Sequence, residues 1–237
     1  MSNILSTAIS DLTEESIFHW NELYACRPRW SKYPPEELVG LIARSFPGAE
    51  QRRGLRALEL GCGPGPNLWF LAREGFAVAG IDGSSIAIES ARERLRLERL
   101  ADSHQEADLR VGNFARLPWD DCSFDVVIDI QAISHNVEPV IRSAISEIRR
   151  VLKPGGRFFA RMFGHKTTGI STGVMIEDGT VRQPTFGPMV GCGLVHAFAE
   201  EEITKLLSPF RDVTLDWVHR SVDGKFNVFE WVVQARR

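Results

Sequence analysis

The spacing of three glycines after a short apolar run is the first feature of this chain that suggests chemistry. The stretch "ALELGCGPGPNLWFLAREGFAVAGIDGSS" (residues 57–85) has the order strand, glycine loop, helix, strand and acidic residue. A glycine loop between a strand and a helix lets backbone N–H groups approach a ligand at the helix N-terminus. The dinucleotide fingerprint G-x-G-x-x-G needs a glycine at position 66, where this chain has Pro66. The spacing of Gly61, Gly63 and Gly65 therefore favours a ligand without a pyrophosphate.

Polar side chains at predicted strand ends could complete a nucleoside site around this loop. Glu59 lies where a carboxylate could hold a cationic amine. Asp82 ends the second predicted strand, where a carboxylate can accept hydrogen bonds from both ribose hydroxyls. Asn113 follows the third strand, and its amide could face an adenine edge while Phe114 stacks or packs nearby. A purine nucleoside that carries an amino acid fits these positions, and S-adenosylmethionine is such a ligand.

Four motifs resemble those of the class I S-adenosylmethionine-dependent methyltransferases, and they occur in the family order. They are "LELGCGPG", "GIDGSS", "GNFARLPWDDCSFDVV" and "RRVLKPGGRF", and the match covers about Arg56 to Met162. The resemblance implies S-adenosylmethionine as cofactor and methyl transfer as the reaction. One departure is Asn113, where the family more often has Asp. The cofactor-binding residues expected from the motifs and from the N-terminal aromatic segment are Glu59, Gly61, Cys62, Gly63, Asp82, Gly83, Ser84, Asn113, Phe114, Trp20 and Trp30.

The N-terminal segment "HWNELYACRPRW" is similar to the tryptophan-bearing helix and loop of thiopurine-type methyltransferases. Trp20, Tyr24, Trp30 and Tyr33 could form an apolar lid over the cofactor. Aromatic residues at helical spacing also commonly belong to a core, so both interpretations stay open.

His135 is the main candidate for a catalytic residue. It follows the fourth predicted strand in "DIQAISHN", at the sheet edge where open α/β sheets bind ligands. A base there could take a proton from an acceptor as the methyl group arrives, although a loop histidine without a role is the alternative. His165 and His196 are further candidates. Asp129 and Asn136 are similar in placement to metal ligands of the catechol methyltransferases, but a third ligand has no counterpart, so we expect no metal site.

The elements that must position these residues are typical of an α/β fold. From Arg56 onward the apolar runs "ALEL", "AVAGI", "DLRV", "FDVVIDI" and "GRFFARMF" alternate with helical patterns. This alternation predicts a doubly wound, seven-stranded, mostly parallel sheet of Rossmann-like methyltransferase type, with an antiparallel last strand. The last two strands, "VTLDWVHR" and "KFNVFEWVVQARR", are expected to form a hairpin around Asp223-Gly224.

The chain is expected to form one domain with two additions. Residues 1–50 are predicted as a helical N-terminal extension that acts as a lid, with one helix in "DLTEESIFHWNELYA", where a Thr supplies the cap, and another in "PPEELVGLIARSF". Residues 51–237 are predicted as the cofactor-binding methyltransferase domain. Its insertion at 164–194 is rich in Gly, Thr and Pro with little periodicity, and we expect it to cover the methyl group of the cofactor.

Composition excludes few classes of function but favours a small acceptor. The 237 residues carry a net charge of −3, and the isoelectric point near 6.1 gives no general attraction to nucleic acid or to anionic membranes. The four cysteines form no C-x-x-C pair, which favours free thiols in a reducing compartment. No signal sequence or membrane-spanning apolar stretch is evident, so a cytoplasmic location is expected.

The expected reaction is therefore methyl transfer to a small molecule. The tetrapeptide typical of base amino-group methylation, Asp or Asn followed by Pro-Pro and an aromatic residue, is replaced by "DIQA". Methylation of a protein or an RNA, another reaction with the same cofactor, and a non-catalytic cofactor-binding subunit are the alternatives. The oligomeric state stays open.

Overall fold

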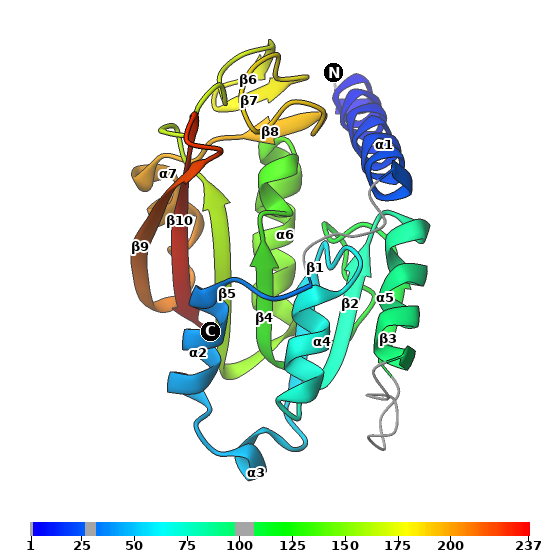
Figure 1. The fold of residues 1–237 in the computed structure, drawn as a ribbon, viewed down its shortest axis with the longest axis vertical. Coiled ribbons are helices and arrows are strands. Elements are labelled where there is room, and N and C mark those ends of the chain that lie inside the picture. The colour runs from blue at the N-terminus through cyan, green and yellow to red at the C-terminus, as the bar shows by residue number, and fades with distance from the viewer. Residues whose placement is uncertain (1, 27–31, 98–106) are drawn as a thin grey trace.

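The computed structural model describes residues 2–26, 32–97 and 107–237. In this part of the chain, seven strands form the central sheet in the order β3-β2-β1-β4-β5-β10-β9 (Figure 1). They are β1 (Arg56–Leu60), β2 (Ala77–Asp82), β3 (Asp108–Val111), β4 (Phe124–Ile130), β5 (Leu152–Phe163), β9 (Arg211–Val222) and β10 (Phe226–Arg236). Strands β1 to β5 are parallel, and β10 is antiparallel to β5 and to β9. The predicted mostly parallel sheet with an antiparallel last strand is confirmed.

Helices cover both faces of this sheet. The elements α2 (Glu36–Ser45), α4 (Pro66–Arg73) and α5 (Ser85–Leu97) cover one face, and α6 (Glu138–Val151) and α7 (Glu200–Leu206) cover the other. Neighbouring residues of a strand face opposite sides, so Ala57 packs with the first group of helices and Leu58 with the second. The fold is thus doubly wound, as predicted.

The N-terminal helix is longer than the sequence pattern indicated. Helix α1 spans Ser2–Cys26, and the short helix α3 spans Ala49–Arg52. Thr13 is therefore not the helix cap that we expected; no Gly or Pro occurs before it, so nothing ends the helix there. Helix α1 packs on the turn before α5, where a Cβ on Gly83 would lie 2.7 Å from Ile17 Cγ1. None of the helices in the described residues is both long enough and apolar enough to cross a bilayer.

The predicted insertion contains regular structure that its sequence did not indicate. In residues 174–196, all of them described, β6 (Val174–Glu177), β7 (Thr180–Arg182) and β8 (Leu194–His196) form an antiparallel sheet. These strands are three or four residues long and are bordered by glycines, which hides the period-2 pattern. Figure 1 shows this small sheet beyond the end of β5, near the N-terminal part of α1. Arg182 Nη1 lies 3.4 Å from Glu15 Oε2 of that helix.

The hairpin between β9 and β10 is confirmed. Its turn contains Asp223 with φ 54° and Gly224 with φ 66°, the left-handed pair that a tight two-residue hairpin needs. This hairpin brings the side chains of β9 and β10 next to the carboxyl end of β5. The division of the chain into an extension and a domain stays a prediction.

Candidate active site

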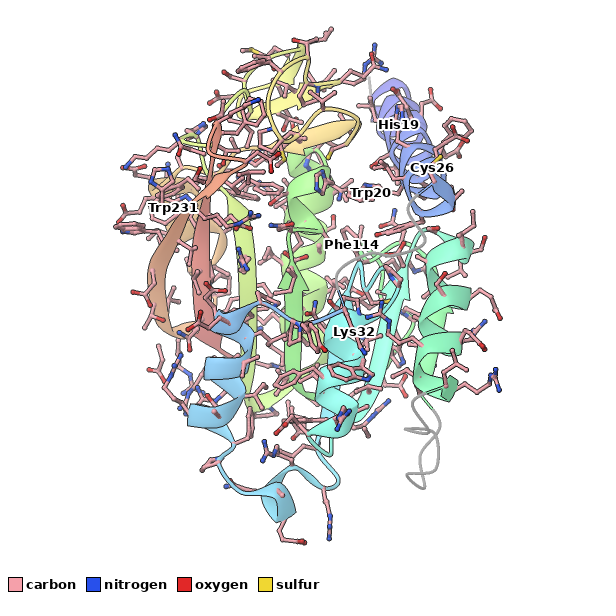
Figure 2. All side chains as sticks on the ribbon, viewed as in Figure 1. His19, Trp20, Cys26, Lys32, Phe114 and Trp231 are labelled. Carbon is pink, nitrogen blue, oxygen red and sulfur yellow. The ribbon has the colours of Figure 1, made fainter. Side chains whose placement is uncertain are left out.

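A cavity of about 410 Å³ lies at the carboxyl edge of the sheet, where a doubly wound sheet binds its ligands. The following predicted site residues line it: Glu59, Gly61, Cys62, Gly63, Asp82, Gly83, Ser84, Asn113, Phe114, Trp20 and His135. Trp30 lies outside the described residues. Tyr24 and Tyr33 also line the cavity, and Figure 2 shows Trp20 extending from α1 into the space between that helix and the sheet.

The glycine loop is held closely between two other elements. Gly61 has φ 56°, and a Cβ at this position would lie 2.2 Å from the Cβ of Ala132, which follows β4. A Cβ at Gly63 would lie 3.0 Å from Tyr24 Oη of α1. Only glycine therefore lets this loop approach both neighbours.

Glu59 presents an unpartnered carboxylate oxygen inside the protein. Its side chain is buried, and its Oε1 accepts a hydrogen bond of 2.6 Å from Asn67 Nδ2. Its Oε2 has no hydrogen-bond partner among the described residues. Burial raises the pKa of Glu59 well above its usual range, against the lowering effect of Asn67. A buried acceptor without a donor is unfavourable, so this oxygen fits the ammonium group of a bound amino acid.

Asp82 joins the glycine loop to the turn before α5. Its Oδ2 accepts a hydrogen bond from the Gly63 N–H at 2.9 Å, and its Oδ1 accepts one from the Ser84 N–H at 2.8 Å. Burial raises the pKa of Asp82, and the two N–H bonds lower it. Each carboxylate oxygen keeps a second lone pair, so both can still accept a ribose hydroxyl. Ser84, rather than Asp82, caps α5, because Ser84 Oγ accepts from the Ala87 N–H at 3.1 Å.

Asn113 lies in the loop after β3. Its Oδ1 accepts a hydrogen bond from the Ala115 N–H at 2.8 Å, which fixes the side chain in a turn. The amide nitrogen makes no hydrogen bond with the described residues. Phe114 packs against apolar side chains on the α6 side of the sheet while it lines the cavity.

His135 ends the 3-10 helix η2 (Ile133–His135), which follows β4. Its Nδ1 lies 2.8 Å from the carbonyl oxygen of Leu194, so this nitrogen carries the proton and donates it. Burial lowers the pKa of His135 to about 4, although the bond to Leu194 raises it. The ring is therefore neutral at physiological pH, and its Nε2 has a free lone pair. The ring of Trp20 lies edge-on to it, with 4.8 Å between the centroids.

The other two histidine candidates lie outside the cavity. His165 is exposed. His196 is buried, and it bonds Thr180 Oγ1 through Nδ1 at 2.6 Å and Glu202 Oε1 through Nε2 at 2.9 Å. Neither histidine lines the cavity.

The pair Asp129 and Asn136 has structural partners. Asp129 Oδ1 accepts from the Ile133 N–H at 3.0 Å, and Asn136 Nδ2 donates to the Ala132 carbonyl at 3.2 Å. Burial raises the pKa of Asp129 to about 8. In residues 2–26, 32–97 and 107–237, no three His, Cys, Asp or Glu side chains are grouped so as to hold a metal ion.

The insertion contributes to the site indirectly. No described residue between 164 and 194 lines the cavity, so the structure gives no direct support to the expectation that this segment covers the methyl group, which stays a prediction. Instead the Leu194 carbonyl orients His135, and a Cβ on Gly193 would lie 3.0 Å from His19 of α1.

Sequence reasoning missed several polar residues of the cavity. Asn67 stands in the first turn of α4, and Gln131, Arg161 and Arg220 line the end of the cavity nearest the hairpin. Arg161 had a usable signal, because it is a charged residue inside the apolar run "RFFARMF". Asn67, Gln131 and Arg220 had no such signal in the sequence, because the direction of their side chains depends on the loops and on the register of the hairpin.

Comparison with known proteins relates this site to one group of enzymes. A family model described as "Methyltransferase domain" matches residues 57–156. A sterol methyltransferase-like 3 from Botryococcus braunii is 28% identical over 164 residues, which are 67% of this chain and 39% of that protein. The chain covers about a third of the length of the curated relatives that it matches.

Solved structures share the same fold. A SAM-dependent methyltransferase from Methanosarcina mazei superposes with a TM-score of 0.64 and 26% identity, over 77% of this chain and 92% of that one. The 1,6-didemethyltoxoflavin-N1-methyltransferase of Burkholderia thailandensis, with bound 1,6-didemethyltoxoflavin and S-adenosylhomocysteine, has a TM-score of 0.62 and 15% identity, over 100% of this chain and 89% of that one. At this lower identity the likeness concerns the fold alone.

Proposed function

Because the chain belongs to the class I S-adenosylmethionine-dependent methyltransferase family, we propose that it transfers a methyl group from S-adenosylmethionine to a small-molecule acceptor. The observation that carries the proposal is the unpartnered Oε2 of Glu59, which lies beside the glycine loop in the same cavity as Asp82 and Asn113. These three side chains are suited to bind, in this order, an amine, the hydroxyls of a ribose and the edge of an adenine.

The residues present fit the cofactor. Glu59 would hold its ammonium group, Asp82 its ribose hydroxyls and Asn113 an edge of its adenine, with Phe114 beside the base. When bound, S-adenosylmethionine supplies an electrophilic methyl group on a positively charged sulfur. The aromatic side chains of Trp20, Tyr24 and Tyr33 would exclude water from the cavity.

His135 would act as the base. Its Nε2 is unprotonated and can take a proton from the acceptor atom, while the Leu194 carbonyl keeps the ring in the required tautomer. A base with so low a pKa accepts a proton only once methyl transfer has made that proton acidic. Positioning of the acceptor supplies a further part of the rate.

A small acceptor is favoured over a macromolecule by two observations. The chain carries a net charge of −3, and the cavity is walled by α1 as well as by the sheet edge. The Burkholderia thailandensis neighbour binds 1,6-didemethyltoxoflavin, which is a small molecule. Methylation of a protein or an RNA and a non-catalytic cofactor-binding role are the alternative proposals. A cytoplasmic location stays a prediction.

Mass spectrometry of reaction products tests this function. The protein is incubated with S-adenosylmethionine and, separately, with a metabolite panel, an RNA pool and a protein extract. We expect S-adenosylhomocysteine to accumulate together with a methylated metabolite, and calorimetry to show binding of S-adenosylhomocysteine but not of NAD. Methylation confined to RNA or protein would replace the small-molecule proposal. Tight cofactor binding without any methylated product would favour the non-catalytic role.

A further inference from the structure

Charged side chains extend across one face of the sheet from the glycine loop toward the hairpin. Glu59 of β1 pairs with Ile128 of β4, and Ile130, two residues later, pairs with Arg161 of β5. Residues two apart in a strand share a face, so Glu59 and Arg161 lie on the same face of the sheet. This is the face that α2 and α4 cover.

The same register continues into the hairpin. Phe163, two residues after Arg161, pairs with Glu230 of β10, and Glu230 pairs with Val218 of β9. Arg220 is two residues after Val218 and therefore shares this face. Arg161, Glu230 and Arg220 thus lie on three adjacent strands, and Arg161 and Arg220 line the cavity.

Arg161 is held in place by partners within the protein. Its Nη1 lies 3.2 Å from Glu37 Oε2, and its Nη2 donates to Glu230 Oε2. Glu230 is fully buried, and its other oxygen accepts from Gln131 Nε2. Each carboxylate oxygen of Glu230 therefore accepts a hydrogen bond from a residue other than Arg220.

Arg220 is placed differently. Its side chain is 50% exposed, and its Nε lies 3.8 Å from Glu230 Oε2, beyond hydrogen-bond distance. Within the described part of the chain, its terminal nitrogens make no hydrogen bond, although Arg220 lines the cavity. A guanidinium group with free paired donors matches the two oxygens of a carboxylate.

The spacing of the strands argues against the cofactor's own carboxylate as the partner of Arg220. In the sheet order, β1 and β9 are four strand steps apart, or about 19 Å at about 4.8 Å per step. Arg220 Nε lies near Glu230 of β10. Measured from β10 instead of β9, the distance to β1 is still three strand steps, or about 14 Å. The carboxylate of an amino acid is attached to the same carbon as its amine, so a cofactor whose amine is held by Glu59 presents it far from Arg220.

We propose that Arg220 binds a carboxylate group of the methyl acceptor, so that the substrate is a small organic acid. Arg161 donates to the Glu230 carboxylate, beside which Arg220 lies. This inference rests on the proposed function and names the substrate class for the same cavity.

The test compares matched acid and amide probes on the protein saturated with S-adenosylhomocysteine. Benzoate is paired with benzamide and hexanoate with hexanamide, and affinities are measured by NMR titration at neutral pH for wild type, Arg220→Gln and Arg211→Gln. Arg211 is the control, because it is exposed, begins the same strand and lies outside the cavity. We expect at least one acid to bind wild type and the control at least about fivefold more tightly than its amide, and Arg220→Gln to lose this preference.

Calorimetry with S-adenosylhomocysteine separates the two possible sources of the carboxylate. We expect the affinity of Arg220→Gln to stay within about twofold of wild type. A larger loss would assign Arg220 to the cofactor and overturn the proposal. Equal binding of acids and amides, no binding of either acid, or an acid preference that survives in Arg220→Gln would also overturn it.

The product screen distinguishes this inference from the proposed function. Methyl transfer to acceptors that carry no carboxylate would refute the subsite and leave the function standing. An acid preference that depends on Arg220, without methyl transfer to any metabolite, would refute the function and leave the subsite standing.

Discussion

The Nδ1 nitrogen of His135 lies 2.8 Å from the carbonyl oxygen of Leu194, the first residue of β8. This bond joins the end of η2 to the insertion and fixes the tautomer of the imidazole. Because Nδ1 carries the proton, the opposite nitrogen of a neutral ring is free to accept one. In the proposed function, the insertion would therefore act on the reaction through the orientation of His135.

The first prediction concerns His135→Asn. The Asn amide nitrogen can still donate to Leu194, but the variant has no group in place of Nε2. We expect kcat to fall by at least about a hundredfold, the usual contribution of a general base, while affinity for S-adenosylhomocysteine stays within about twofold. Steady-state kinetics and calorimetry measure the two quantities. Unchanged turnover would show that positioning alone drives the reaction.

The pH dependence supplies a second readout for this residue. Burial lowers the pKa of His135 to about 4, so the base form is present above that pH and is lost as the pH falls through it. We expect no inflection near 6.5, the pKa of a solvated imidazole, in the wild-type profile of kcat between pH 5 and 8. An inflection there that disappears in His135→Asn would contradict the buried, neutral state of the ring.

The second prediction concerns Glu59→Gln. The replacement keeps an oxygen for Asn67 but removes the charge that would face the ammonium group of the cofactor. We expect affinity for S-adenosylhomocysteine to fall by at least about tenfold, as for a lost charge-assisted hydrogen bond. 5′-Methylthioadenosine lacks the amine, and its affinity should stay within about twofold of wild type. Equal losses for the two ligands would place the amine elsewhere.

Much of the fold, and many of the residues that line the cavity, could be predicted from the sequence, because both depend on local patterns. Apolar runs identified β1 to β5, and a parallel sheet brings the strand ends, with Glu59 and Asp82, to one edge. The packing partners could not be predicted. Asn67 meets Glu59 only because the glycine loop turns α4 back over β1, and Arg161 meets Glu230 only through the register of β10. Contacts that depend on loop geometry and long-range register leave no periodic signal.

The third prediction separates backbone strain from close packing at the glycine loop. In Gly61→Ala, the new Cβ would lie 2.2 Å from Ala132 Cβ, whereas Gly54 also has a positive φ (+85°) but nothing within 4 Å of a Cβ. We expect Gly54→Ala to lower the free energy of unfolding by about 1 kcal/mol, the strain of a left-handed residue. Gly61→Ala should cost at least about 2 kcal/mol and weaken S-adenosylhomocysteine binding.

Urea denaturation measures both glycine variants. Adding Ala132→Gly to Gly61→Ala removes the clashing methyl group and should restore part of the lost stability, although Ala132→Gly alone should not stabilise the protein. Equal destabilisation by Gly54→Ala and Gly61→Ala would mean that the loop can move away from Ala132.

The last prediction concerns Asp129, whose Oδ2 is buried without a hydrogen-bond partner among the described residues. Burial raises the pKa of this carboxyl group from 3.8 to about 8 in the folded protein. Between these two values the native state binds more protons than the unfolded chain, so Asp129 destabilises the protein progressively as the pH rises from about 4 to about 8.

Asp129→Asn keeps an oxygen for the Ile133 N–H and cannot ionise. We expect the variant to be more stable than wild type at pH 8, by roughly 5 kcal/mol, and the difference to shrink toward zero near pH 4. Urea denaturation of both proteins across this range measures it, and other titrating groups cancel in the difference. A difference that stays constant with pH would mean that the pKa of Asp129 is not raised in the folded protein.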